Sequence, residues 1–165
     1  MLHPLVQKYR RKGILVDANL LVVLLVGKLG PEYLKNCRAT KSKSFTPDDF
    51  SRLQRFVVQF DKLVTTPHIL TEVSNLAGRL PEPLLGEFRA MFRDVVKSLY
   101  EQPLPAKEIA QDAQFLRFGL TDTAIKMIAP GRYLVLTTEW PLCGLLQQRK
   151  VDVINFNHFR DFGGP

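Results

Sequence analysis

The chain of 165 residues is 45% hydrophobic and 24% charged, so it can bury one ordinary core without disulfides, and we predict a single domain over residues 1–165. Its 23 basic and 16 acidic residues give a net charge of +7, which favours a polyanionic partner such as nucleic acid, with plain surface solubility as the alternative. The two cysteines, Cys37 and Cys143, form neither a disulfide framework nor a Cys/His zinc motif, and they fit a reducing cytoplasm.

The N-terminal segment predicts a buried strand followed by a buried helix. Residues 13–16 form a short apolar strand, which Asp17 ends. Asn19 is placed to cap a helix that runs to Leu25 and is apolar on all sides. The apolar run to Val26 is interrupted by Asp17 and Asn19, and no small-residue cleavage site follows. We therefore expect neither a membrane span nor a secretory signal here.

Helix start signals organise the next part of the chain. Thr46 caps a helix that Pro47 opens, and residues 62–65 form the second strand. Residues 67–77 form a helix that a glycine ends, and residues 84–99 form another. The core-facing residues of this last helix, at helical spacing, are Leu85, Phe88, Phe92, Val95, Val96 and Leu99.

The C-terminal part continues the alternation of helices and strands. Residues 106–118 predict a helix that a glycine ends, and residues 121–130 predict the next. Residues 133–137 form the clearest strand, residues 141–149 a helix, and residues 151–156 the last strand. Strands separated by helices predict an α/β fold with a central, mostly parallel sheet. Ligands of such sheets bind beyond the carboxyl ends of the strands.

Four acidic residues fall at that edge of the expected sheet. Asp17 ends the first strand, and Glu72 lies early in the helix after the second. Asp122 opens the helix before the clearest strand, and Glu139 follows that strand. Clustered carboxylates repel one another, and a divalent cation relieves this repulsion. Oxygen ligands suit Mg²⁺ or Mn²⁺, which can activate water for attack on a phosphodiester.

Each acid also has a structural interpretation when it is taken alone. Asp17 can be a helix N-cap without any part in a metal site. Glu72 and Asp122 can each stabilise the positive end of a helix. Glu139 can be a solvated loop residue. The ordered set is what favours a shared site over these separate roles.

Four short motifs, in order along the chain, resemble those of the PIN-domain ribonucleases. The motifs are residues 14–19 (ILVDAN), 66–73 (TPHILTEV), 120–125 (LTDTAI) and 136–139 (LTTE). Each motif alone is short, but their order and approximate spacing match those of the family. Together they cover most of the chain between residues 13 and 156.

The resemblance implies a PIN-like three-layer α/β/α domain that hydrolyses RNA phosphodiesters with Mg²⁺ or Mn²⁺. The residues that match the family's catalytic, metal-binding acids are Asp17, Glu72, Asp122 and Glu139. Asn19 and Thr138 match its supporting polar positions. Because many small PIN proteins are toxins of bacterial toxin–antitoxin pairs, the resemblance also implies two protein partners, an antitoxin and a second copy of the chain in a homodimer.

Two other functions remain open. Glu139 replaces the shorter Asp that is usual in the family, and the bulky pair Trp140-Pro141 follows it. This difference favours a catalytically degenerate PIN scaffold that binds RNA or a protein. The other alternative is a phosphotransfer enzyme with Asp17 as nucleophile. An enzyme of the haloacid-dehalogenase type would have a second Asp in place of Asn19.

Two groups of basic residues are candidate RNA contacts. The first is a stripe with a spacing of four residues on the 84–99 helix, and the second is a loop rich in Ser and Thr. Their members are Arg89, Arg93 and Lys97 in the stripe, and Arg38, Lys41 and Lys43 in the loop. Both can follow an RNA backbone, and a solvated helix face is the alternative for the stripe.

Overall fold

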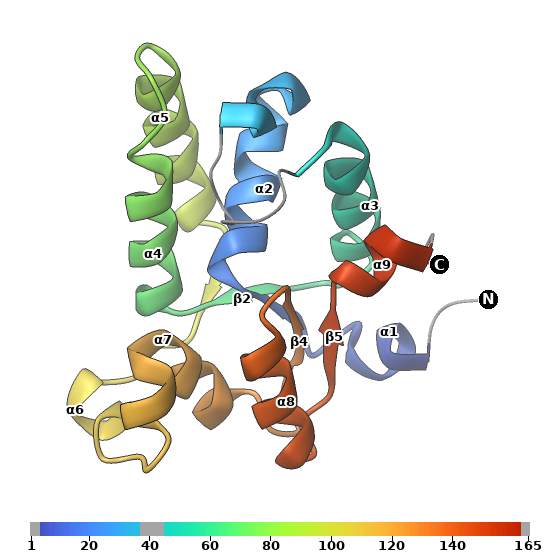
Figure 1. Cartoon of the computed structure of the whole chain (residues 1–165), viewed down its shortest axis with the longest axis vertical. Helices are drawn as coiled ribbons and strands as arrows, with labels where there is room; N and C mark the ends of the chain where they lie inside the picture. The colour runs from blue at the N-terminus through green and yellow to red at the C-terminus, as the bar shows by residue number, and fades with distance from the viewer. Residues whose placement is uncertain (1–3, 37–44, 163–165) are drawn as a thin grey trace.

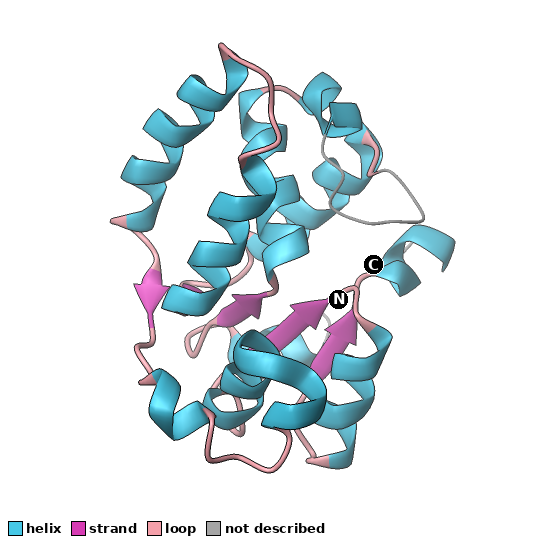
Figure 2. Ribbon diagram, turned by 60° about the vertical axis from the view of Figure 1, so that its left-hand side comes forward, coloured by secondary structure: helices cyan, strands magenta, loops and turns pink. Residues whose placement is uncertain are grey.

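The computed structural model describes residues 4–36 and 45–162. Its strands form one sheet in the order β3-β2-β1-β4-β5, and every neighbouring pair is parallel. The strands are β1 (Ile14–Val16), β2 (Leu63–Thr65), β3 (Tyr100–Glu101), β4 (Leu134–Thr137) and β5 (Val153–Asn155). Helices cover both faces of the sheet (Figure 1 and Figure 2). The expected α/β/α fold of PIN-like architecture is confirmed, with a fully parallel sheet.

Two layers of helices enclose this sheet. One layer holds α2 (Ala18–Leu29), the 3-10 helix η1 (Pro31–Asn36), α3 (Pro47–Val57), α4 (Pro67–Ala77) and α5 (Leu84–Val96). The other layer holds α6 (Ala106–Ile109), α7 (Phe115–Ile128) and α8 (Trp140–Gln148). Figure 1 shows the first group above the sheet and the second group below it. The described chain begins with α1 (Pro4–Tyr9) and ends with α9 (Asn157–Phe162).

The order of the strands creates a switch point between β1 and β4. From β1 the chain moves outward to β2 and β3, and it then returns to the opposite side of β1 to form β4 and β5. The helix after β1 therefore covers one face of the sheet, and the helix after β4 covers the other (Figure 1). The two connections diverge beyond the carboxyl ends of these strands, which is where open α/β sheets bind ligands.

The central helix α2 is buried on all sides, as its sequence predicts. It packs against α3, α4 and α5 on the sheet, and residues 20–27 are all buried. The prediction that Asn19 caps it is wrong, because Asp17 is the N-cap and accepts a hydrogen bond from the Ala18 backbone. The helix also continues to Leu29, beyond the predicted end. Within the described ranges, no helix combines the length and hydrophobicity needed to cross a bilayer.

The predicted helix over 106–118 is wrong. Within this range the chain forms α6, then turns, and then the first residues of α7 from Phe115. The side chain of Asp112 stabilises the turn, because it accepts a hydrogen bond from the Gln114 backbone at 2.8 Å and pairs with Lys126 of α7. Gly119, with φ 75° and ψ −168°, then interrupts α7, as a glycine can in this left-handed region. The break expected after residue 118 is therefore present.

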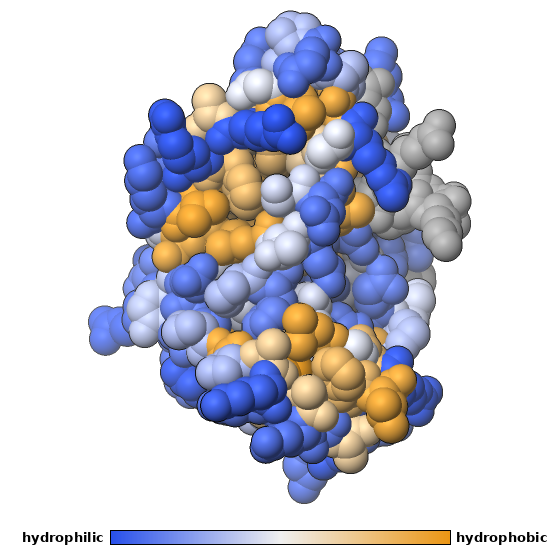
Figure 3. Space-filling view, turned by 90° about the vertical axis from the view of Figure 1, so that its left-hand side faces the viewer, coloured by the Kyte–Doolittle hydropathy of each residue, from blue (hydrophilic) through white to orange (hydrophobic). Residues whose placement is uncertain are grey.

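The helix predicted over 84–99 ends earlier, at Val96, and Lys97 is its C-cap. Phe88 is the only residue of the predicted core face that is buried. Leu84, at the start of the helix, is also buried but was not part of that predicted face. The other predicted core residues are half-buried, and the residues on the outer side of α5 are exposed. Figure 3 shows the result as hydrophobic side chains at the surface over α4 and α5.

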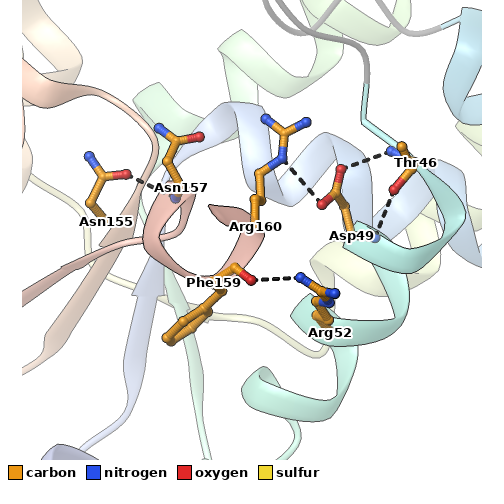
Figure 4. Close-up of polar contacts among 7 residues, drawn as sticks. All are labelled: Thr46, Asp49, Arg52, Asn155, Asn157, Phe159 and Arg160. Carbon is orange, nitrogen blue, oxygen red and sulfur yellow. Dashed lines mark hydrogen bonds and ion pairs between the residues drawn. The ribbon is translucent and has the colours of Figure 1, made fainter. Parts of the chain in front are cut away.

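The C-terminal helix α9 is fixed to α3 by polar contacts (Figure 4). Arg160 and Asp49 point toward one another and form an ion pair of 3.2 Å, with only 14% and 7% of their side chains exposed. Arg52 donates a 2.7 Å hydrogen bond to the Phe159 carbonyl. Asp49 also completes the capping box at the start of α3 with Thr46. These contacts fix the segment that follows β5, beside the edge where β1 and β4 end.

Candidate active site

A cleft of about 530 Å³ opens at the carboxyl ends of β1 and β4, where the start of α4 meets α7. Its lining residues are Asp17, Asn19, His68, Thr71, Glu72, Phe118, Gly119, Leu120, Thr121, Asp122 and Glu139. The structure therefore brings all of the predicted acids together in one cleft, although they come from separate elements. Asn19, the predicted supporting residue, lies among them.

Asp17 is the fixed and buried member of this group. It follows β1 and is 4% exposed. Its Oδ1 accepts a 2.7 Å hydrogen bond from the Ala18 backbone, and its Oδ2 accepts one of 2.7 Å from the Thr137 hydroxyl. Burial raises the pKa of Asp17 to about 6, against the lowering effect of these hydrogen bonds and with a further rise from the charges of Glu72 and Glu139.

Asp122 is held at the opposite wall, in the part of α7 that follows the Gly119 break. Its side chain is half-buried, and no hydrogen bond joins its carboxylate to another described residue. Burial raises the pKa of Asp122 to about 7, and the charges of Asp17, Glu72 and Glu139 add to the rise. Asp17 and Asp122 thus each feel the charge of both glutamates, as a shared site requires.

The two glutamates lie at the open side of the cleft and are exposed. Glu72 of α4 accepts a hydrogen bond from the Thr121 hydroxyl, which joins α4 to α7. Glu139 accepts a 3.1 Å hydrogen bond from Nδ2 of Asn19. Its backbone N–H donates to the Thr137 hydroxyl oxygen at 3.0 Å.

The donor set of the cleft fits a hard divalent cation by its chemistry. Its charged ligands are all carboxylates, the oxygen ligands that Mg²⁺ and Mn²⁺ prefer, and the charges of Glu72 and Glu139 add to the raised pKa values of Asp17 and Asp122. In the part of the chain that the structure describes, no three His, Cys, Asp or Glu side chains already stand at ligand spacing. Glu72 and Glu139 are turned to Thr121 and Asn19 instead of to a common centre.

The residue that supports the acids most directly is Thr137, which the sequence did not single out. Thr137 is the last residue of β4, and Thr138 lies in the bend that follows it. Thr137 contacts both Asp17 and Glu139. The predicted supporting residue Thr138 is buried, and its hydroxyl has no hydrogen-bond partner among the described residues. The sequence motif identified the correct strand end, but it did not indicate which of the two threonine hydroxyls contacts the acids.

The predicted basic stripe lies outside the cleft. Arg89, Arg93 and Lys97 are all exposed. Asp94 lies 3.3 Å from both Arg93 and Lys97 and neutralises part of the stripe. The predicted loop contacts Arg38, Lys41 and Lys43 lie outside the described residues.

His68 and Phe118 also line the cleft. His68 belongs to the second sequence motif, where it fits a packed helix residue as well as a catalytic one, whereas no sequence motif indicates a role for Phe118. His68 lies in the first turn of α4, and its Nδ1 is buried without a hydrogen-bond partner in the described structure. Phe118 lies just before the Gly119 break, and the Arg117 guanidinium stands 5.2 Å from the centre of its ring.

Comparison with known proteins adds no assignment to this geometry. Neither the models of known protein families nor the curated proteins give a match for the chain.

Proposed function

We propose that the chain is a metal-dependent endoribonuclease of the PIN type, and that Asp17, Glu72, Asp122 and Glu139 bind Mg²⁺ or Mn²⁺. One observation carries this proposal: acids from separate elements meet in one cleft, at the switch point of a parallel sheet. Structural carboxylates are usually paired with cations, but no Lys or Arg lines this cleft among the described residues. Uncompensated acids at such a place are a functional arrangement.

The carboxylates of the cleft include a fixed group and a movable group. Asp17 is locked by the Ala18 backbone and the Thr137 hydroxyl, so it can fix the position of a cation. When bound, the cation supplies Lewis-acid chemistry: it lowers the pKa of water and offsets the charge that builds on a phosphodiester. Asp17 and Asp122, with raised pKa values, give up their protons when it binds.

Glu72 and Glu139 are the movable groups. Both are long, exposed side chains, each tied by a hydrogen bond to a neutral neighbour. If they turn toward the cation, the Thr121 hydroxyl and the Asn19 amide lose their present acceptors. These two donors then face the cleft and can bind phosphate oxygens of the substrate.

RNA as the substrate is supported by the net charge of +7 and by the motifs described above. A role as a toxin, with an antitoxin partner and a homodimeric state, rests on the resemblance alone. The gene next to this one tests that role, since a toxin is expected to have a short neighbouring gene for a DNA-binding protein.

Cleavage of a mixed RNA pool by the purified protein tests the proposal. We expect cleavage with Mn²⁺ or Mg²⁺, none with EDTA, and none by the Asp17→Asn variant. Glu87→Gln is the matched control, because Glu87 is an exposed acid on α5 outside the cleft. Cleavage that persists in EDTA or in Asp17→Asn would contradict the proposal.

A second candidate function, a non-catalytic scaffold that binds RNA, is favoured by one observation. Glu72 and Glu139 are satisfied by Thr121 and Asn19, so the described cleft is not arranged as a ligand set. A scaffold of this kind binds RNA without cleaving it and shows no affinity for Mn²⁺. Affinity for the metal therefore separates the two candidates.

A further inference from the structure

The tryptophan beside the cleft is exposed. Trp140 is the only Trp of the chain, and 57% of it is accessible to solvent. An exposed apolar side chain is common by itself, but Trp140 directly follows the acid Glu139. Consecutive Cα atoms are about 3.8 Å apart, so the indole is anchored next to the cleft.

Trp140 forms a surface with His158. Their ring centres are 5.3 Å apart and their planes meet at 59°. Trp140 begins α8, just after β4, and His158 lies at the start of α9, just after β5. Both rings therefore stand at the same edge of the sheet as the acids.

The segment that carries His158 is rigidly attached. On one side of it, the Asn157 side chain donates a 3.1 Å hydrogen bond to the Thr138 carbonyl, next to Glu139. On the other side, Phe159 is buried, and Arg160 pairs with Asp49 of α3. Figure 4 shows Asn157, Phe159 and Arg160 around this turn of α9. A rigid aromatic surface binds a flat partner without first having to be ordered.

We propose that Trp140 and His158 form a stacking subsite for one nucleobase of single-stranded RNA, whose adjoining phosphate lies at the acidic cleft. This inference rests on the proposed nuclease function. Every nucleobase has a π-face, so an exposed Trp binds bases without strong preference among them. Phe118, which lines the other side of the cleft and has the Arg117 guanidinium 5.2 Å from its ring centre, offers a second aromatic surface for the same strand.

The observations favour RNA over a protein as the occupant. A protein-binding Trp usually lies within a wider apolar patch, whereas the neighbours here are the acid Glu139, the exposed Pro141 and the imidazole of His158. A single strand passing from Phe118 to Trp140 would carry its phosphates across the acids. The chain's net charge of +7 draws such a strand to the molecule.

The fluorescence of the single Trp provides a direct test. Short single-stranded RNA is added to the full-length protein at low ionic strength, once with EDTA and once with Mg²⁺, while the anisotropy of a label on the RNA reports binding. We expect RNA to quench the Trp emission in at least one of the two conditions. An oligomer of the same length with abasic nucleotides should leave the emission unchanged.

Variants separate stacking from a merely structural role. Trp140→Ala should weaken RNA binding by roughly tenfold, as expected for the loss of one stacked base. Trp140→Phe should recover much of this affinity. His158→Ala should weaken binding less, because it leaves the indole in place. Val58→Ala is the control, because Val58 is 71% exposed at the end of α3 and does not line the cleft. This variant should bind RNA as the unchanged protein does.

The outcomes distinguish this inference from the proposed function. RNA binding with unchanged Trp emission, or with unchanged affinity in Trp140→Ala, would overturn the subsite and leave this surface to a protein partner. Quenching that needs bases, without cleavage in any metal, would support the subsite and contradict the nuclease. The absence of RNA binding in both EDTA and Mg²⁺ would contradict both.

Discussion

The hydroxyl of Thr137 donates a 2.7 Å hydrogen bond to Oδ2 of Asp17 and so joins the ends of the two central strands. The same hydroxyl oxygen accepts a 3.0 Å hydrogen bond from the Glu139 backbone. One uncharged group therefore positions an acid from each side of the switch point. Its donation to the carboxylate lowers the pKa of Asp17 and limits the rise that burial causes.

Replacement of Thr137 by Val should damage the site without removing an acid. Oδ2 of Asp17 and the Glu139 N–H would lose their partner, which should cost about 1 to 3 kcal/mol of stability. Because the lost hydrogen bond favours the charged carboxylate, the pKa of Asp17 should rise and metal-dependent cleavage should begin at higher pH. Chemical denaturation and a pH–rate profile measure the two effects. Thr137→Ser keeps the hydroxyl and should stay close to the unchanged protein; an unshifted profile in Thr137→Val would contradict this role.

The metal-free protein should become less stable as the pH rises from 5 to 8. The folded-state pKa values of Asp17 and Asp122, about 6 and about 7, lie above the ordinary value of 3.8. The folded state therefore holds these protons more tightly than the unfolded state, and the resulting stability is lost as the pH passes through these values. Thermal unfolding in EDTA at pH 5 and pH 8 measures the change.

The Asp122→Asn variant isolates one of the two acids. The amide carries no charge, so the metal-free variant should be more stable than the unchanged protein at pH 8, by about 1 kcal/mol or a few degrees of Tm. Asp48→Asn, at an exposed position of α3, serves as the control. A variant with the same pH dependence as the unchanged protein would show that Asp122 does not carry the effect.

The fold was predictable from the sequence where local signals agree with burial. Apolar runs such as Leu134–Thr137 formed strands, and Thr46 and Thr66 capped the helices that follow them. The edge strand β3 was missed, because Tyr100 and Glu101 are both exposed and form a strand only by pairing with β2. The short helices α1 and α9 were also missed, since six residues carry too little periodicity to show.

The sequence predicted which strands and helices supply the candidate site, but it did not predict the contacts between their side chains. Parallel strand ends share one edge, so the convergence of Asp17 and Glu139 followed from chain order. The choice between Thr137 and Thr138 depended on how the chain bends after β4, which the sequence does not specify. The turn of Glu72 toward Thr121 and of Glu139 toward Asn19 depended on side-chain rotamers and on the break at Gly119.

The ion pair between Asp49 and Arg160 should carry much of the stability of the C-terminal helix. Asp49→Ala leaves a mostly buried guanidinium without this partner and removes the capping box of α3, which should cost about 3 kcal/mol. Urea denaturation measures the loss. The neighbouring exposed acid supplies the control, because Asp48→Ala should change stability by less than about 0.5 kcal/mol. Equal effects of the two substitutions would contradict this account of α9.

Two glycines in helices should respond to alanine in opposite directions. A Cβ on Gly27 of α2 would lie 2.1 Å from Cδ2 of Phe50, so Gly27→Ala must displace α3 and should cost about 1 to 3 kcal/mol or more. A Cβ on Gly144 of α8 meets nothing within 4 Å. Gly144→Ala should therefore stabilise the helix by about 0.5 to 1 kcal/mol. Thermal unfolding of both variants checks the packing of α2 against α3.

The most direct test of the central claim, that the acids form one cation site, is calorimetric titration with Mn²⁺ at about pH 6.5, between the pKa values of Asp17 and Asp122. The same titration in two buffers of different ionisation enthalpy gives the number of protons that the protein releases on binding. We predict binding with proton release by the unchanged protein and by Glu87→Gln, and binding at least about tenfold weaker by Asp17→Asn. No binding by the unchanged protein, or equal binding by Asp17→Asn, would contradict the claim and favour the non-catalytic scaffold.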